Sequence, residues 1–496
     1  MSQIKIENLS FAYPGSGDSV FENLNLQLDS DWKLGFIGRN GRGKTTLLRL
    51  LMGEGEYPYE GKIIAGLPFD YFPYPVAHGD WLTMEVLQEH CGQAGDWQLL
   101  RELRLLGFPE EAQWRPFDSL SQGEQTKALL AALFLREDRF HLIDEPTNHL
   151  DGEARRQVSR WLAGKRGYIL VSHDRAFLDG CVDHILALNK SGAEIQFGNF
   201  SSWWENKARQ DAFEQEQNLR LKKEIQRLEQ ASQQRRQKAD AVERAKTGIA
   251  SQGIVKHGLR PYLGEKSRKG QQQRKNIDRR AERALEEKEN LLKDLEQKES
   301  LKLAPLTARG RLLELREICL FYGEKQVCGP VCFQLEPGER IALHGSNGSG
   351  KSTLMKLLLG ETEANYTGTV TRLSGLRISY VPQDTAFLRG SLRDYARERD
   401  LDESLFKAIL RKMDFSREQF EKDMADFSAG QKKKVLLAGS LCQQAHLYLW
   451  DEPLNFIDIY SRMQIEELLL QYRPTMVFVE HDEAFRQRIA TKVIEL

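Results

Sequence analysis

The stretch "WKLGFIGRNGRGKTTLLRLL", residues 32–51, is repeated as "ERIALHGSNGSGKSTLMKLL" at residues 339–358. Each copy begins with a short apolar run of strand character, continues through a glycine-rich turn and ends in a segment with helical spacing. The turns match the pattern G-x-x-x-x-G-K-[ST] at residues 38–45 and 345–352. Glycines in this pattern let backbone N–H groups close around phosphate oxygens, where side chains would collide. The repeat therefore predicts two α/β phosphate-binding domains in tandem.

The two turns also supply charged and hydroxyl groups for a nucleotide. Lys44 and Lys351 are expected to reach the β- and γ-phosphates, and the hydroxyls of Thr45 and Ser352 to ligate Mg²⁺. The helix after each turn points its positive end at the phosphates. The turn residues predicted to bind ATP are Gly38, Arg39, Asn40, Gly41, Arg42, Gly43, Lys44, Thr45 and Thr46 in the first copy, and Gly345, Ser346, Asn347, Gly348, Ser349, Gly350, Lys351, Ser352 and Thr353 in the second.

A second pair of repeats carries acidic residues. "FHLIDEPTNHLD" (140–151) and "LYLWDEPLNFID" (447–458) each run an apolar strand into Asp-Glu. The aspartates are predicted to hold Mg²⁺ and the glutamates to orient and polarise the attacking water. Downstream, "ILVSHD" and "VFVEHD" place a histidine after another strand, within reach of a γ-phosphate. The predicted catalytic residues are Glu145, Glu452, His173 and His481, and the predicted metal ligands are Thr45, Asp144, Ser352, Gln383 and Asp451.

A third pair of repeats indicates the family. "LSQGEQ" (120–125) and "FSAGQK" (427–432) resemble the signature motif of ATP-binding cassette (ABC) ATPases. In that family two cassettes pair head to tail, so the resemblance implies that each signature completes the site of the other cassette. Site one would combine Lys44, Asp144, Glu145 and His173 with Ser428 and Gly430. Site two would combine Lys351, Asp451, Glu452 and His481 with Ser121 and Gly123.

Several positions depart from the family pattern or allow two interpretations. Tyr13 and Tyr322 fall where an aromatic ring stacks on adenine, although either could simply pack at a strand end. Gln383 of "YVPQD" is expected to sense Mg²⁺ and the γ-phosphate, whereas Tyr74 stands at that position in "YFPYP". A phenol does not ligate the metal as an amide carbonyl does. We therefore expect both sites to hydrolyse ATP, but unequally.

Composition limits the remaining possibilities. The chain has 496 residues, a formal net charge of −1 and six cysteines without a CxxC pair. This length suits two or three domains, and no apolar run approaches the roughly 18 residues of a membrane span. The first residues lack the apolar region of a secretory signal. Free thiols in a reducing cytoplasm are favoured over disulfides or a metal site. A cytoplasmic location is therefore expected.

The segment between the repeats has a different character. We assign residues 1–202 and 307–496 to the two ATPase domains and 203–306 to a linker, predicted as an antiparallel helical hairpin rich in Glu, Gln, Lys, Arg and Ala. Residues 235–280 contain fourteen Lys/Arg and four Asp/Glu, a surplus of ten positive charges. A coiled coil with a solvated surface would mix the signs, so this surplus favours phosphate contacts. The predicted contact residues at its tip are Lys256, Leu259, Arg260, Tyr262, Leu263, Lys266, Arg268 and Lys269.

Two cassettes joined by a long charged hairpin resemble the ABC-F family, and "LSQGEQTKALLAALFL" with "DEPLNFIDIYSR" is most similar to its Lsa-type antibiotic-resistance group. The resemblance implies an ATP- and Mg²⁺-dependent monomer with no membrane domain and no DNA partner. It would bind the bacterial 70S ribosome near the exit tRNA site, contact large-subunit rRNA and peptidyl-tRNA, and displace lincosamides, pleuromutilins and streptogramin A. Two alternatives stay open: a translation factor for stalled ribosomes, and the ATPase subunit of a transporter.

Overall fold

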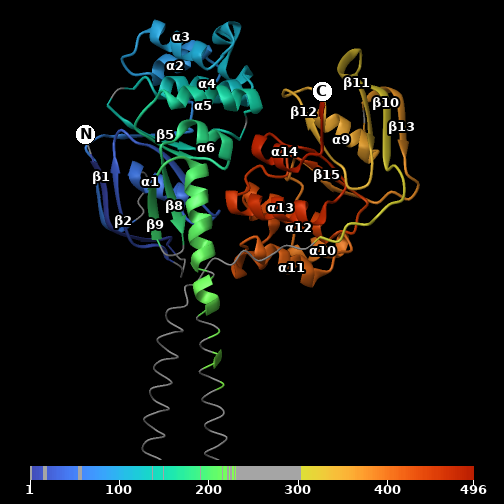
Figure 1. Ribbon diagram of the computed structural model, residues 1–496. Coiled ribbons are helices and arrows are strands. Elements are labelled where there is room, and N and C mark those ends of the chain that lie inside the picture. Colours follow the sequence, from blue (N-terminus) through green and yellow to red (C-terminus); the bar gives the residue numbers. More distant parts are fainter. Residues whose placement is uncertain are drawn as a thin grey trace, which may run out of the picture. The chain divides into compact units, whose positions relative to one another are not determined.

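The computed structural model describes residues 3–14, 19–53, 58–136, 138–148, 150–189, 192–214, 216–220, 223, 226–227, 230, 303–362 and 364–496. Within them the first domain runs from β1 to β9 and the second domain from β10 to β17 (Figure 1). The described residues of Met1–Trp203 and Glu299–Leu496, which hold both domains, form one compact unit, and the described linker residues from Trp204 on are separate from it. The predicted tandem of two α/β domains is confirmed.

Each domain contains a mainly parallel sheet built from short apolar strands. In the first domain the order is β5-β6-β7-β3-β8-β9, with β9 antiparallel to β8. Its strands are β3 Lys33–Gly38, β5 Phe69–Phe72, β6 Phe140–Asp144, β7 Tyr168–Val171, β8 His184–Asn189 and β9 Gly192–Phe197. In the second domain the order β14-β15-β16-β12-β17 is parallel throughout. Its strands are β12 Arg340–His344, β14 Ile378–Val381, β15 Leu447–Asp451, β16 Met476–Val479 and β17 Lys492–Glu495.

A smaller antiparallel sheet completes each domain, with alternating buried and exposed residues because one face is covered. The orders are β2-β1-β4 and β11-β10-β13. The strands are β1 Gln3–Ala12, β2 Ser19–Asp29 and β4 Glu60–Ile64, and β10 Leu313–Tyr322, β11 Lys325–Leu335 and β13 Asn365–Arg372.

Helices follow the strands of the parallel sheets. In the first domain they are α1 Lys44–Met52, α2 Thr83–His90, α3 Asp96–Leu105, α4 Gln122–Leu133, α5 Gly152–Ala163 and α6 Arg175–Cys181, with 3₁₀ turns η1 Glu110–Trp114 and η2 Phe117–Ser119. In the second they are α9 Lys351–Leu359, α10 Leu392–Glu398, α11 Glu403–Lys412, α12 Ala429–Cys442, α13 Ile459–Tyr472 and α14 Glu483–Ile489, with η3 Arg417–Phe420 and η4 Met424–Asp426.

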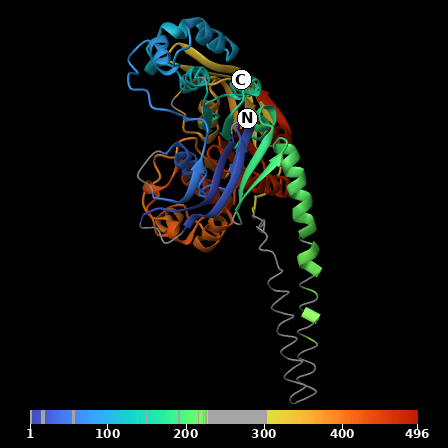
Figure 2. The same ribbon diagram turned by 90° about the vertical axis from the view of Figure 1, so that its left-hand side faces the viewer.

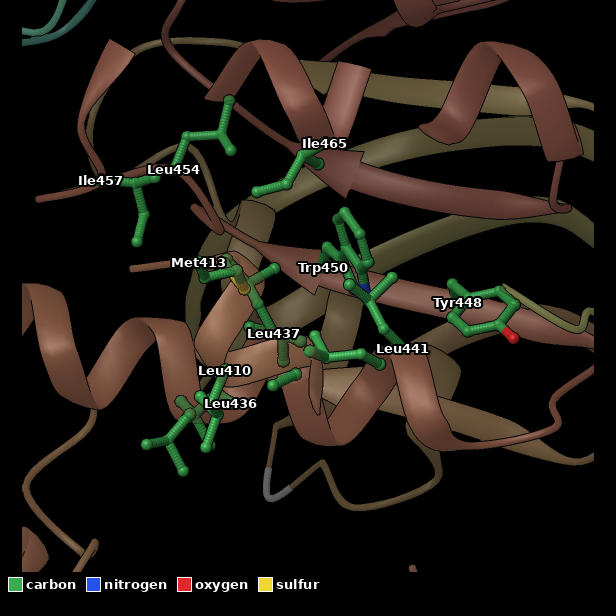
Figure 3. Close-up of a cluster of buried hydrophobic side chains, with 14 of the residues drawn as sticks. Leu410, Met413, Leu436, Leu437, Leu441, Tyr448, Trp450, Leu454, Ile457 and Ile465 are labelled. Atoms are coloured by element: carbon green, nitrogen blue, oxygen red, sulfur yellow. The ribbon is translucent and has the colours of Figure 1, made fainter. Parts of the chain in front are cut away.

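The hydrophobic cores hold the helices that carry the predicted motifs. In the first domain, leucines of α1 pack between the antiparallel sheet and the parallel sheet in one cluster with β1, β2, β3 and β6. In the second domain, Leu436, Leu437 and Leu441 of α12 belong to the same buried cluster as Trp450 of β15 (Figure 3). The Trp450 indole N–H also donates to Ser440 Oγ at 2.9 Å. The core therefore fixes α12 against the strand that ends in the predicted metal ligand Asp451.

The linker begins with a helix over residues 200–214, shown in green in Figure 2. Trp203 is 2% exposed and contacts Phe200 and the ring of Tyr460, with centroids 5.8 and 6.5 Å apart. Trp203 is therefore a packing residue at the root of the linker. Residues 231–302 of the predicted hairpin, which include all eight tip residues from Lys256 to Lys269, lie outside the described residues.

Candidate nucleotide-binding sites

Both glycine-rich turns form the loop that the sequence predicts, between β3 and α1 and between β12 and α9. Gly43 has φ 91° and Gly350 has φ 86°, a left-handed conformation that favours glycine. A Cβ on Gly43 would lie 2.6 Å from Val20 Cγ1, and one on Gly350 would lie 2.8 Å from Cys328 Cβ. Both glycines are therefore required by conformation and by space. The first turns of α1 and α9 contain no acidic residue, which leaves their positive ends open to an anion.

The loop lysines lie at the centre of these turns. Lys44 Nζ donates to the carbonyl oxygens of Gly38 and Arg39 at 2.8 and 3.2 Å. Lys351 Nζ donates in the same way to Gly345 and Ser346 at 3.0 and 2.7 Å. Burial lowers the pKa of both lysines, although nearby carboxylates oppose this shift. Two desolvated ammonium groups inside rings of backbone amides suit phosphate.

The predicted metal ligands come together at the ends of β6 and β15. Thr45 Oγ1 donates to Asp144 Oδ2 at 2.8 Å. In the second domain the Ser352 hydroxyl lies close enough to the carboxylate of Asp451 to oppose the rise that burial causes in its pKa. Asp451 Oδ1 is buried without a hydrogen-bond partner, and burial raises the pKa of Asp451 to about 6. A hydroxyl with a carboxylate is the oxygen set that Mg²⁺ accepts alongside substrate phosphates and water. The residues present therefore fit Mg²⁺, although no cluster of three or more His, Cys, Asp or Glu side chains that could hold a metal occurs in the part of the chain that the structure describes.

Each predicted glutamate faces its predicted histidine. His173 Nε2 lies 3.2 Å from Glu145 Oε1, and His481 Nε2 lies 3.2 Å from Glu452 Oε1. Only the second pair has hydrogen-bond geometry, because Glu145 Oε1 is buried without a hydrogen-bond partner. Both glutamates have a left-handed backbone, with φ of 52° and 46°. Such strain is typical of functional sites.

The two glutamates differ in proton affinity. Burial and the neighbouring Asp144 raise the pKa of Glu145 to about 8. Burial acts in the same direction on Glu452, but hydrogen bonds from His481 and Gln383 outweigh it and lower its pKa. The Gln383 amide donates to Glu452 Oε2 at 2.9 Å. At neutral pH Glu452 is therefore ionised and able to accept a proton, whereas Glu145 is largely protonated. The two sites differ in this respect.

A cavity of ≈ 740 Å³ gathers the predicted members of site two from both domains. It is lined by the signature residues Ser121 and Gly123 of the first domain and by Lys351, Glu452 and His481 of the second. Ser121 also caps α4, as its hydroxyl accepts from the Glu124 N–H at 3.3 Å. The further lining residues that the sequence predicted are Tyr322, Asn347, Gly348, Gly350, Ser352, Thr353 and Gln383.

Site one is assembled from the complementary halves. A Cβ on Gly430 would lie 3.2 Å from Asn40 Nδ2 of the first loop and 2.6 Å from the carbonyl oxygen of Phe456. Asn40 Nδ2 donates to that same carbonyl at 2.8 Å. Ser428 caps α12, where its hydroxyl accepts from the Gln431 N–H at 3.3 Å. The second signature thus lies beside the first loop. That it completes site one stays a prediction.

The two predicted adenine-stacking tyrosines are accessible. Tyr322 lines the site-two cavity and is 52% exposed. Tyr13 is 40% exposed and its hydroxyl lies 2.7 Å from Thr46 Oγ1, directly beside the first loop. Both rings are therefore positioned beside a phosphate-binding loop.

One residue that contacts a predicted metal ligand was not predicted from the sequence. Tyr74, at the position of Gln383, points away from the acidic pair: its hydroxyl donates to the Leu129 carbonyl at 3.1 Å and its ring stacks on His90. Tyr71, three residues earlier, instead donates to Asp144 Oδ2 at 3.0 Å. Its counterpart in the second domain, Tyr380, lies near Asp451. Burial of the Tyr380 phenol, and then the negative charge of Asp451, raise the pKa of Tyr380 to about 12. The repeated stretches "YFPY" and "YVPQ" place Tyr71 and Tyr380 at the same position, so the sequence contained a signal for Tyr71.

Comparison with known proteins agrees with this geometry. The family model described as "ABC transporter" matches residues 21–148 and 328–455. The chain is similar to the ribosome protection protein VmlR of Bacillus subtilis (29% identical, covering 98% of this chain and 85% of VmlR). It is also similar to the energy-dependent translational throttle protein EttA of Haemophilus influenzae (25% identical, covering 96% and 89%).

Among solved structures, the fold is similar to that of the archaeal ribosome recycling factor aABCE1 in its complex with the stalk protein aP1. The TM-score is 0.63 at 18% identity, covering 98% of this chain and 87% of that one. Within the described ranges, none of the helices has the length and apolar character needed to cross a membrane.

Proposed function

This chain belongs to the ABC transporter family, as a tandem ABC ATPase of the ABC-F type, and on that premise we propose that it is a ribosome-protection ATPase. In its ATP-bound, closed state it docks on the bacterial ribosome near the exit tRNA site, in the cytoplasm. Its linker then perturbs the peptidyl-tRNA end and dislodges the antibiotic, and hydrolysis reopens the cassettes. The drugs proposed are those of the Lsa-type group: lincosamides, pleuromutilins and streptogramin A.

The ATPase cycle follows from residues of both cassettes. Lys351 and the backbone of its loop bind the phosphates, while Ser121 and Gly123 close the site from the other cassette. Glu452, hydrogen-bonded to His481 and Gln383, orients the attacking water and accepts its proton. Mg²⁺ would be held by Ser352, Asp451 and Gln383 in site two and by Thr45 and Asp144 in site one. Bound there, the ion neutralises charge that develops on the phosphates.

The site-two cavity is the observation that carries this proposal. Because its walls come from both cassettes, ATP can bind in full only when the cassettes are closed, which couples nucleotide state to a change of shape. The ribosome is proposed as the target because VmlR, a ribosome protection protein, is similar over 98% of this chain. The ten surplus positive charges of residues 235–280 agree with an RNA partner.

A second candidate function is a translation factor that acts on stalled ribosomes without any drug. The similarity to EttA, a translational throttle protein, over 96% of this chain favours it. Both candidates use the same ATPase sites and the same ribosomal partner, so they differ only in whether a drug is displaced.

Two experiments test these proposals in order. Glu145→Gln with Glu452→Gln should remove water activation and keep the phosphate contacts, which traps the closed state. This double variant should co-sediment with 70S ribosomes in ATP, whereas Lys44→Ala with Lys351→Ala should not. If the trapped variant stays free of ribosomes, the ribosomal proposal is wrong. Expression of the natural chain in a susceptible strain should then raise the inhibitory concentration of the three drug classes, and no change would favour the translation factor.

A further inference from the structure

Lys433 is a buried lysine with no role in the ATPase cycle proposed above. It lies in the first half of α12, five residues after the signature serine, and is 2% exposed. Lysine is almost never fully buried unless its charge is compensated. Its Nζ donates to the carbonyl oxygens of Pro382, Gln383 and Asp451 at 2.8, 3.2 and 3.3 Å. All three donors of the ammonium are therefore directed at backbone carbonyls.

These carbonyls belong to the two segments that present the predicted metal groups of site two. Pro382 and Gln383 follow β14, and Asp451 ends β15. The side chain of Gln383 reaches Glu452 Oε2 at 2.9 Å, and Asp451 Oδ1 is buried without a hydrogen-bond partner. The carboxylates of Asp451, Glu480 and Glu452 lie near the ammonium and offset part of its burial cost. Lys433 thus joins the loop of Gln383 to the strand end of Asp451.

The first domain offers an internal comparison. Thr126 stands five residues after the signature serine Ser121, at the position of Lys433. Its hydroxyl donates to the carbonyl of Gln122 in its own helix at 2.9 Å. This bond therefore does not connect the helix to β6, the strand that ends in Asp144. The first domain also has Tyr74 in place of Gln383, turned toward Leu129. The lysine and the glutamine therefore occur together in one domain and are both replaced in the other.

We propose that Lys433 is a positioning residue of site two, which holds the Gln383 loop and the Asp451 strand end in register for Mg²⁺ and the γ-phosphate. The ammonium acts through the backbone and does not itself touch the nucleotide. Without it, Gln383 and Asp451 move independently, and the metal-bound geometry forms less often. The residue thereby contributes to the inequality of the two sites.

The test compares Lys433→Met, which keeps the length but removes three donors, with Lys433→Arg, which keeps charge and donors. Both are made in the Glu145→Gln background, so that turnover reports on site two. Lys433→Met should lower kcat about tenfold, because small misplacements in an active site have large kinetic effects. It should also raise the half-saturating Mg²⁺ concentration about fivefold, while KM for ATP changes less than about twofold, and Lys433→Arg should recover most of the loss. Lys422→Met, which applies the same change to an exposed lysine of the same domain outside the signature, is the matched control.

A binding measurement separates positioning from a general loss of structure. In the Glu452→Gln background with ATP, Mn²⁺ titrated by electron paramagnetic resonance should bind about fivefold more weakly to the Lys433→Met protein, with an unchanged thermal midpoint. If Lys433→Met does not fold, Lys433→Gln is measured in the same way. The proposal is overturned by unchanged Mn²⁺ affinity and kcat. It is also overturned if kcat, ATP affinity and the thermal midpoint all fall together and Lys433→Arg is no better than Lys433→Met.

Discussion

The hydroxyl of Tyr71 donates a 3.0 Å hydrogen bond to Asp144 Oδ2, the same carboxylate oxygen that accepts from Thr45 at 2.8 Å. The predicted metal aspartate of site one is thus oriented by two hydroxyl groups from different elements, β5 and α1. Tyr74, which occupies the glutamine position, has no part in this contact because its hydroxyl is bonded to Leu129. The tyrosine that contacts the predicted metal ligand of site one is therefore Tyr71 and not Tyr74.

Tyr71→Phe should weaken the binding of Mg²⁺ at site one. Removing one hydrogen bond to a charged group costs about 1.5–3 kcal/mol when the bond is buried, and less here because Tyr71 is only partly buried. We expect the half-saturating Mg²⁺ concentration for turnover in the Glu452→Gln background to rise about fivefold. Tyr74→Phe, which also deletes one hydroxyl, is the control and should leave this concentration unchanged. Equal effects of the two variants would contradict the assignment.

The two sites should respond differently to pH. Because burial and Asp144 raise the pKa of Glu145 to about 8, this glutamate is mostly protonated at pH 7 and gains its ability to accept a proton as the pH rises through 8. The pKa of Glu452 is lowered, so it is already ionised. Turnover of Glu452→Gln, which reports on site one, should increase between about pH 7 and 9, one unit on either side of that pKa.

Turnover of Glu145→Gln, which reports on site two, should be nearly flat over the same range. At pH 7, Glu452→Gln should therefore lower the turnover of the protein more than Glu145→Gln does. Superimposable pH profiles, or equal losses at neutral pH, would count against the inequality of the sites.

Gly430→Ala should impair site one without unfolding the protein. The new Cβ would lie 2.6 Å from the Phe456 carbonyl oxygen, a backbone atom that cannot easily move, and 3.2 Å from Asn40. The first loop and the second signature would be forced apart, so turnover in the Glu452→Gln background should fall about tenfold. The control is Ala429→Ser at the exposed neighbouring position. A Gly430→Ala protein with natural turnover would show that closure does not bring these residues together.

The charged tip of the linker can be tested by salt dependence. Replacing Lys256, Arg260, Lys266, Arg268 and Lys269 with glutamine should weaken ribosome binding. The slope of log affinity against log salt should shrink by up to about one unit for each phosphate that the variant no longer neutralises. ATP hydrolysis by the isolated protein should be unaffected. Unchanged ribosome affinity at physiological salt would mean that the tip is a passive turn.

The apolar tip residues should behave differently from the charged ones. Replacing Leu259, Tyr262 and Leu263 with alanine removes no charge, so ribosome binding should be nearly unchanged. If these side chains act on the drug site, the variant should lose drug protection in a susceptible strain. A variant that keeps full protection would exclude them from drug displacement.

Local sequence was sufficient for the elements of each domain, and it placed most of the candidate site residues on them, whose roles stay predictions. A glycine-rich turn needs left-handed glycines at given positions, and a buried parallel strand needs a short apolar run. Both patterns can therefore be recognised from about twenty consecutive residues. Lys44, Lys351, Asp144 and Asp451 could be predicted in this way. The repeat doubled the evidence for each of them, and the signature motifs with their family resemblance indicated which half completes which site.

Tertiary structure decided what depends on distance between segments far apart in sequence. The sequence aligned Tyr71 with Tyr380 but did not show that a hydroxyl from β5 would reach Asp144 at the end of β6. It did not show that Lys433 would be buried against two strand ends rather than solvated on the surface of its helix. The different pKa shifts of Glu145 and Glu452 arise because desolvation and through-space hydrogen bonds depend on packing, which near-identical motifs do not encode.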